Sequence, residues 1–163
     1  MLDFTKSENI YFDFWIKPEY FLNPPFMKLM IDNEVFFEDL VKKDMHLRFK
    51  KSCSFEEIHK IKILRSGKTN NDTEILADGT LKSQMLTMEK IKIDNIDLRN
   101  LIHHRCVYTP SYPEPWATQQ RNKGVKLSKT LNGTMALGHN GQWEFAFKSP
   151  VYKFLIDWIQ NQL

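Results

Sequence analysis

The chain has 163 residues, of which 42% are hydrophobic and 13% aromatic, enough to fill the core of one domain spanning residues 1–163. Its 23 Lys and Arg residues exceed its 20 Asp and Glu residues by a formal charge of +3 that is spread along the chain. This weak excess argues against a nucleic-acid-binding protein, which needs clustered cations. The start of the chain predicts no signal peptide, and no window approaches the roughly 20 apolar residues of a membrane span.

The first half of the chain predicts a series of short strands. Residues Asn9 to Ile16 are apolar on both faces of a strand, a pattern typical of a strand covered on two sides. Strand-like runs at 26–31 and 35–40 flank the polar residues Asp32, Asn33 and Glu34, which indicates a hairpin. Residues 45–49 alternate again and predict a further strand.

Two further segments alternate isoleucine with lysine. The segment Glu57 to Arg65 places its isoleucines on one face and its lysines on the other, and the segment Met85 to Leu98 repeats the pattern before it bends at Asp94 and Asn95. The second segment predicts a central strand with one face on the core. It is followed by a short strand-like piece from Leu101 to Tyr108.

The last third begins with a long loop. Residues 109–133 are rich in proline and aromatic residues and carry few periodic apolar positions, so they predict a loop with one helical turn at Pro115 to Arg121. The strand-like runs 134–138 and 142–148 then flank His139, Asn140 and Gly141, which indicates a second hairpin.

The segment 149–163 changes to helical periodicity. Ser149 in the N-cap position and Pro150 in the first helical position predict its start. Its apolar stripe must cover either the open end of the sheets or a partner, and the candidate partner-binding residues are Tyr152, Leu155, Trp158 and Ile159. The whole pattern predicts an all-β protein, a jelly-roll-like antiparallel β-sandwich with a C-terminal amphipathic helix.

The long loop carries the residue types that bind sugars. Aromatic rings held by prolines offer flat surfaces for stacking on a sugar ring, and neighbouring polar side chains can bind its hydroxyl groups. The candidate glycan-binding residues are Tyr108, Tyr112, Trp116, Gln119, Gln120 and Arg121. In the alternative interpretation these rings fold inward and anchor the loop on the core.

Calcium is the one cofactor that the residue pattern suggests. Asn71 and Asp72 in one polar segment and Asp97 in another supply oxygen atoms of the kind that calcium prefers. The alternative is that these residues simply form turns.

Signals for other chemistry are weak. His103, His104 and Cys106 resemble metal ligands, but on a strand at most two of them share a face. Cys106 and Cys53 are expected to be reduced and partly buried, with a single bridge between them left open. Glu114 and Glu144 are the candidate carboxylates for glycoside hydrolysis, yet no catalytic motif accompanies them, so we expect no enzyme.

Several motifs together suggest a relationship. They are K-T-N-N-D-T, I-K-I-D-N-I-D-L, Y-P-E-P-W and L-G-H-N-G-Q-W-E-F-x-F-x-S-P-V-Y. With them, the chain from Met27 onward resembles small uncharacterised proteins of tailed bacteriophages, especially marine and cyanobacterial ones. Its general form is also similar to calcium-dependent carbohydrate-binding modules of the xylan-binding kind, in which a jelly-roll sandwich presents calcium and a sugar at a loop.

The resemblance implies a non-catalytic accessory protein of the virion, made in the host cytoplasm, such as a head decoration or tail-associated module. Its partners would then be other virion proteins, with host surface polysaccharide as a further ligand and self-association left open. The alternative function is a calcium-assisted carbohydrate-binding module. Neither hypothesis includes nucleic acid or insertion into a membrane.

Overall fold

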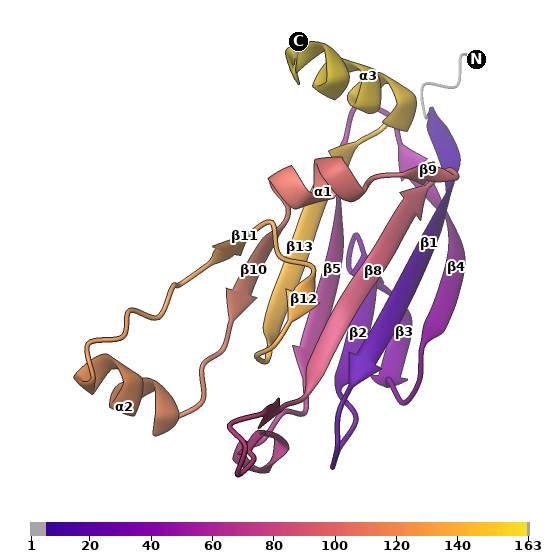
Figure 1. The fold of residues 1–163 in the computed structure, drawn as a ribbon. Helices are drawn as coiled ribbons and strands as arrows, with labels where there is room; N and C mark the ends of the chain where they lie inside the picture. Colours follow the sequence, from indigo (N-terminus) through magenta and orange to yellow (C-terminus); the bar gives the residue numbers. More distant parts are fainter. Residues whose placement is uncertain (1–5, 163) are drawn as a thin grey trace.

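The computed structural model describes residues 6–162, so residues 1–5 and Leu163 of the predicted domain lie outside the described residues. Two antiparallel sheets pack face to face (Figure 1). Sheet A has the strand order β12-β8-β1-β4, with β9 also paired to β8, and sheet B has the order β11-β10-β13-β5-β2-β3. These two sheets confirm the predicted jelly-roll-like β-sandwich.

The elements have the following bounds. Sheet A contains β1 (Ser7–Glu19), β4 (Met45–Ser54), β8 (Met85–Ile93), β9 (Ile96–Asp97) and β12 (Ala136–Leu137). Sheet B contains β2 (Phe26–Ile31), β3 (Glu34–Leu40), β5 (Ile58–Ser66), β10 (Val107–Pro110), β11 (Leu131–Asn132) and β13 (Gly141–Lys148). A small hairpin, β6 (Glu74–Ile75) and β7 (Leu81–Lys82), follows the 3-10 turn η1 (Asn70–Asp72). The helices are α1 (Arg99–Arg105), α2 (Trp116–Asn122) and α3 (Val151–Gln162).

The core lies between the sheets and follows the alternation of the strands. Phe12 and Phe14 of β1 and Ile91 of β8 point inward from sheet A, and Trp143 and Phe145 of β13 point inward from sheet B, all fully buried. Burial of these apolar faces is the main force that holds the sheets together. Both cysteines are buried free thiols, as expected.

Two predicted turns are confirmed by their backbone. Asp32 and Asn33 join β2 to β3 with φ of 51° and 66°, and Asp94 and Asn95 join β8 to β9 with φ of 48° and 65°. Asn and Asp tolerate this left-handed conformation better than other non-glycine residues, which explains their presence there.

The strand predicted from Leu101 to Tyr108 is wrong in its first half. This part of the chain forms α1, because Leu98, Leu101 and Ile102 share one helix face that is buried against the end of the sandwich. His103 and His104 are exposed on this helix, so the predicted strand faces for the metal-like cluster do not exist.

The hairpin predicted around His139 to Gly141 is also wrong. β12 pairs with β8 in sheet A, whereas β13 pairs with β10 and β5 in sheet B, so the chain crosses between sheets at this point. The residue types of a tight turn also suit such a crossing, which explains the error.

The outer face of β1 differs from its prediction as well. Tyr11 is 40% exposed and Trp15 is half-buried, so no second layer covers this face of the strand. Asp13 between them is buried by side chains of β4, not by a further sheet.

Helix α3 begins later than predicted. Its first residue is Val151, so Ser149 and Pro150 precede it, and a carboxylate oxygen of Glu8 accepts hydrogen bonds from both the Ser149 hydroxyl group and the Val151 N–H group. Glu8 therefore takes the capping role expected of Ser149.

The faces of α3 separate the candidate partner-binding residues. Leu155 is buried and Trp158 is half-buried against the core, so these two residues cover the end of the sandwich. Leu155 was therefore wrongly assigned to a partner interface. Tyr152 and Ile159 are more than half exposed, as is Ile156. No helix within residues 6–162 is long and apolar enough to span a membrane.

Candidate functional site

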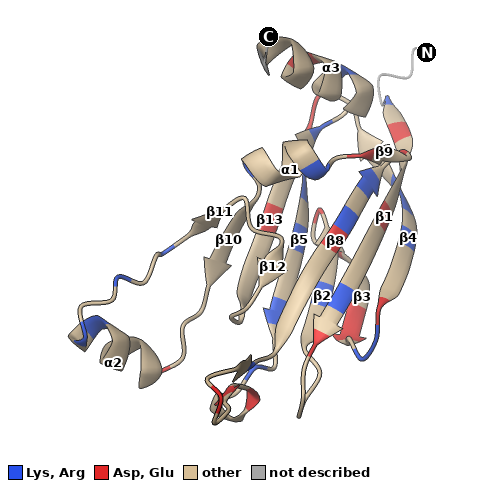
Figure 2. Ribbon diagram, in the orientation of Figure 1, with Lys and Arg blue, Asp and Glu red and all other residues tan. Residues whose placement is uncertain are grey.

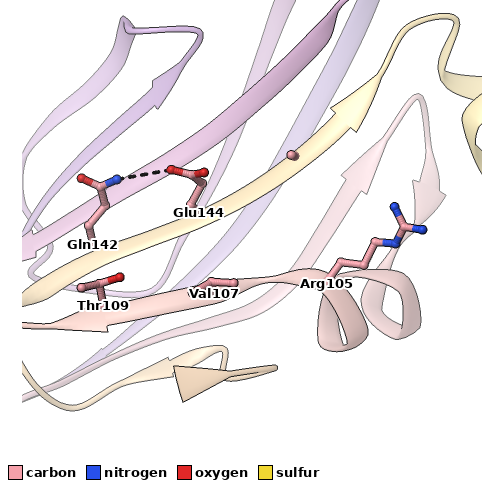
Figure 3. Close-up of a pocket in the computed structure, with 6 residues that line it drawn as sticks. Arg105, Val107, Thr109, Gln142 and Glu144 are labelled. Carbon is pink, nitrogen blue, oxygen red and sulfur yellow. Dashed lines mark hydrogen bonds between the residues drawn. The ribbon is translucent and has the colours of Figure 1, made fainter. Parts of the chain in front are cut away.

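An open groove of about 360 Å³ runs along the outer face of sheet B between β10 and β13 (Figure 3). Its lining residues are Arg105, Val107, Thr109, Gln142, Glu144 and Ala146. Strand pairing sets Val107 opposite Glu144 and Thr109 opposite Gln142. Because side chains alternate along a strand, these residues face outward while their neighbours Tyr108 and Trp143 enter the core.

The groove offers both donors and acceptors of hydrogen bonds. The Gln142 amide points to Glu144 Oε2 at 3.4 Å, and Lys60 Nζ lies 3.2 Å from Glu144 Oε1. Arg105 is exposed at the end of α1, where its guanidinium group lies 5.6 Å from the centre of the Phe154 ring. Val107 and Ala146 add a small apolar area. Such a surface suits a small polar ligand that also has apolar C–H groups.

The predicted aromatic platform has a different geometry from that expected. The rings of Tyr112 and Trp116 are half-buried, lie 6.1 Å apart and are tilted by 34°, so they are not coplanar. Both rings contact His139, at 5.1 and 5.5 Å, and the Tyr112 hydroxyl group donates to the Ser128 carbonyl oxygen. These contacts favour the alternative interpretation, in which the rings anchor the loop.

Tyr108 is removed from the glycan-binding candidates. Its side chain is 1% exposed, and its hydroxyl group donates to the His139 carbonyl oxygen. Burial raises the pKa of Tyr108 to about 12, so the phenol stays neutral inside the protein. A ring in this position supports the core and has no access to a ligand.

The other loop candidates lie on α2. This helix confirms the predicted helical turn, and it extends away from the two sheets on an arm of the chain (Figure 1). Gln119 and Arg121 are exposed on it, whereas Gln120 is half-buried. Arg121 lies 3.6 Å from Glu114, so its charge is partly satisfied within the arm. The role of α2 in ligand binding stays a prediction.

The predicted calcium ligands do not fit one ion. Asp72 is buried, and its carboxylate accepts hydrogen bonds from Thr69 in its own turn and from Asn23 in the loop before β2. Asp97 of β9 lies opposite Lys92 in the strand pairing. This position is about seven residues, or about 23 Å, from the start of β8. Asp72 lies near the opposite end of β8, because its partner Asn23 also contacts Gln84, which comes just before the start of that strand.

The predicted cluster around His103 does not form a metal site. The described part of the chain contains no cluster of three or more His, Cys, Asp or Glu side chains that could hold a metal ion. His103, His104 and Cys106 therefore do not form such a cluster, alone or with other described residues. Burial raises the pKa of the Cys106 thiol, which makes it a poorer metal ligand.

A buried polar network lies where the β12–β13 crossing meets β5. Arg65 is 1% exposed, and it donates to Asn140 Oδ1 at 2.8 Å and to the Gln84 carbonyl oxygen at 2.7 Å. Lys68 donates through Nζ to Ser83 and to the carbonyl oxygen of Gly138. Burial lowers the pKa of Arg65 and that of Lys68. The network ties the loops of both sheets together, and the sequence analysis did not identify it.

The groove residues were largely missed by the sequence analysis. Only Glu144 was named in advance, as a candidate carboxylate. The available signal was the alternation of polar residues in β13, but nothing local shows that β10 pairs beside it.

Comparisons with known proteins identify no family for this chain. No family model matches the chain, and no curated protein matches it. One solved structure, described as vCBM60 in complex with galactobiose, matches 83% of this chain and 96% of its own chain, at 9% sequence identity and a TM-score of 0.46.

Proposed function

We propose that this protein is a non-catalytic glycan-binding module whose ligand occupies the groove between β10 and β13. The observation that carries the proposal is the groove itself, whose volume of about 360 Å³ suits a short oligosaccharide. Sugar hydroxyl groups both donate and accept hydrogen bonds, which matches Arg105 as donor, Glu144 as acceptor and Gln142 as both. Val107 and Ala146 are placed to contact the C–H groups of a sugar ring.

The number and positions of the carboxylates support ligand binding rather than hydrolysis. Most glycosidases use two carboxyl groups on either side of the bond that is cleaved. Glu144 is the one carboxylate among the residues that line the groove. Glu114, the other candidate, accepts hydrogen bonds from Thr118 and lies close to Arg121 within the α2 arm.

Glu144→Ala is expected to weaken the binding of a neutral oligosaccharide at least about tenfold, because hydrogen bonds to a charged group contribute about 1.5–3 kcal/mol. We would first screen a panel of neutral oligosaccharides and then measure the affinity of the best one by calorimetry. The same affinity is expected with calcium and with a chelator, since the predicted calcium ligands do not meet.

Glu38→Ala is the matched control for this experiment. Glu38 also lies on sheet B and is also paired with a lysine, with its Oε1 atom 4.0 Å from Lys28 Nζ. The proposal predicts that this variant binds like the wild type. Equal weakening by both variants, or no binding by the wild type, would count against the groove as the site.

For the wider context, we propose an accessory role in the virion of a tailed phage, as a head decoration or tail-associated module. The observation that favours attachment to another virion protein is a stripe on α3. Tyr152, Ile156 and Ile159 follow helix-face spacing and are 52%, 53% and 53% exposed. A stripe of this kind is a common feature of interaction surfaces.

The double substitution Ile156→Asp with Ile159→Asp is expected to reduce incorporation into particles several-fold, because two charges would have to be buried at the contact. Incorporation would be measured in purified particles, with Gln160→Asp as an exposed control on the same helix. Trp158 is a poorer probe than the sequence indicates, because its ring packs against the core and its removal also affects folding. Unchanged incorporation of the double variant would exclude this stripe.

A further inference from the structure

The outer face of sheet A gathers basic side chains around two aromatic rings. We name this surface the cationic face and define it by Tyr11 and Trp15 of β1, Arg48 and Lys50 of β4, and Lys90 and Lys92 of β8. Strand pairing brings these residues together, because Tyr11 lies opposite Lys50 while Trp15 lies opposite Lys90. Figure 2 shows the basic positions along β8, with one acidic position beside them.

The lysines of this face are not neutralised by carboxylates. Within residues 6–162, no ion pair involves Lys50, Lys90 or Lys92. The ammonium groups of Lys90 and Lys92 instead lie 5.3 and 5.7 Å from the centre of the Trp15 ring. A cation above an aromatic ring keeps its full charge while the ring holds it in place.

Each acidic residue near this face has a partner or lies at its margin. Asp13 lies within the face but is buried, and it pairs with Arg48 at 3.1 Å and with His46 at 2.7 Å, so it balances the charge of Arg48 and not that of a lysine. Asp97 accepts a hydrogen bond from the Arg99 N–H group, and Glu89 lies next to Lys90 at the irregularity between β1 and β8. The outer face of sheet B is different, because there Lys28 is paired with Glu38 and Lys60 with Glu144.

The spacing of the charges suits an extended polyanion. Lys90 and Lys92 are separated by two strand residues, about 7 Å, and β4 lies about 10 Å from β8 across β1. On β4, Lys50 supplies the third cation without a carboxylate partner, whereas Arg48 is paired with Asp13. A linear chain with regularly repeated negative groups can therefore contact several cations at once.

The ring faces argue against single-stranded nucleic acid as the occupant. Trp15 stacks on His46 of β4 at 4.1 Å and 8°, and the lysines of β8 cover it from the other side of β1. The guanidinium group of Arg48 lies 4.7 Å from the centre of the Tyr11 ring. Binding of single strands depends on bases that stack on free aromatic faces, and here His46 and the cations occupy positions over these rings.

We propose that the cationic face binds an acidic polysaccharide, a linear chain whose sugars carry carboxylate groups. This second surface lies on the opposite sheet from the groove and does not depend on the groove's function. The carboxylates contact Lys50, Lys90 and Lys92, and binding weakens as salt screens these contacts.

The test uses polygalacturonate and its methyl ester, which share a backbone and differ in charge. The wild type is expected to bind polygalacturonate and not the ester. Lys90→Gln with Lys92→Gln should weaken binding at least about tenfold, equivalent to about 1.4 kcal/mol. Lys28→Gln with Lys62→Gln removes the same charge from sheet B and should change the affinity less than about twofold.

Further arms separate the alternatives. Lys50 lies on β4 and is not one of the lysines near the Trp15 ring, and Lys50→Gln should also weaken binding of polygalacturonate. Melting curves check that each variant folds. Glu144→Ala should bind polygalacturonate like the wild type, so a failure of the groove is distinguishable from a failure of this face. Equal weakening by both double variants, equal binding of the ester, no binding by the wild type, or tighter binding of oligodeoxythymidine would overturn the proposal.

Discussion

Replacing Gly141 with alanine is expected to lower the free energy of unfolding by about 3 kcal/mol, the upper end of what overpacking costs. A Cβ atom at this position would meet the Thr109 carbonyl oxygen, and it would lie 2.8 Å from Pro110 Cα and 2.9 Å from the Tyr108 hydroxyl oxygen. Most of these atoms belong to the backbone of β10, which cannot move away without losing its pairing with β13. The substitution therefore separates the two strands that form the groove.

Gly138→Ala is the matched control for Gly141→Ala. Its Cβ atom would meet only the flexible side chain of Met85, at 3.4 and 3.7 Å. We expect a change below about 1 kcal/mol for this variant. Urea denaturation measures both free energies, and oligosaccharide binding should be weakened only by Gly141→Ala. Similar stability of the two variants would show that β10 and β13 do not approach each other as closely as described.

The strands could be predicted because burial on one face leaves a period of two in the sequence. Ile91 and Ile93 alternate with Lys90 and Lys92 regardless of which strand pairs with β8. The turn at Asp94 was equally visible, because its residue types match the left-handed backbone. Both patterns lie in neighbouring residues, so they can be recognised without knowledge of the tertiary structure.

The path of the chain at β12 and β13 could not be predicted in the same way. Asn140 and Gly141 have the composition of a hairpin turn, but Gly141 is required by the close approach of β10, and Ser111 donates its backbone N–H to the Asn140 carbonyl oxygen. These contacts join residues that are about 30 positions apart in sequence. A local pattern cannot show which sheet receives each strand.

The binding surfaces depend on such long-range pairing even more strongly. The groove exists because Thr109 lies opposite Gln142, and the cationic face exists because β1 lies between β4 and β8. The lysines of β8 were interpreted only as the solvent side of a strand. Their position above Trp15, some 75 residues earlier, follows from the register of the two strands.

The second large effect is expected for Asn140→Ala, which should lower the free energy of unfolding by about 3 kcal/mol. Asn140 Oδ1 accepts hydrogen bonds from Arg65 Nη1 and from the Lys68 N–H group, and Asn140 Nδ2 donates to the Lys68 carbonyl oxygen. The guanidinium group is buried, and its Nε atom has no acceptor among the described residues. Loss of a further acceptor leaves a buried charge poorly solvated, and one such bond contributes about 1.5–3 kcal/mol.

Two further variants accompany Asn140→Ala: a control for the loss of an asparagine side chain, and a test of whether the charge of Arg65 explains the lost stability. Asn122→Ala changes an exposed asparagine at the end of α2 and should cost less than about 0.5 kcal/mol. Asn140→Asp keeps both acceptor contacts and adds a negative charge beside Arg65, so it should be more stable than Asn140→Ala at neutral pH. Acid protonates the new carboxylate and should remove that advantage. If Asn140→Asp and Asn140→Ala are equally unstable at neutral pH, the network is held by the amide donor of Asn140 and not by solvation of the buried guanidinium group.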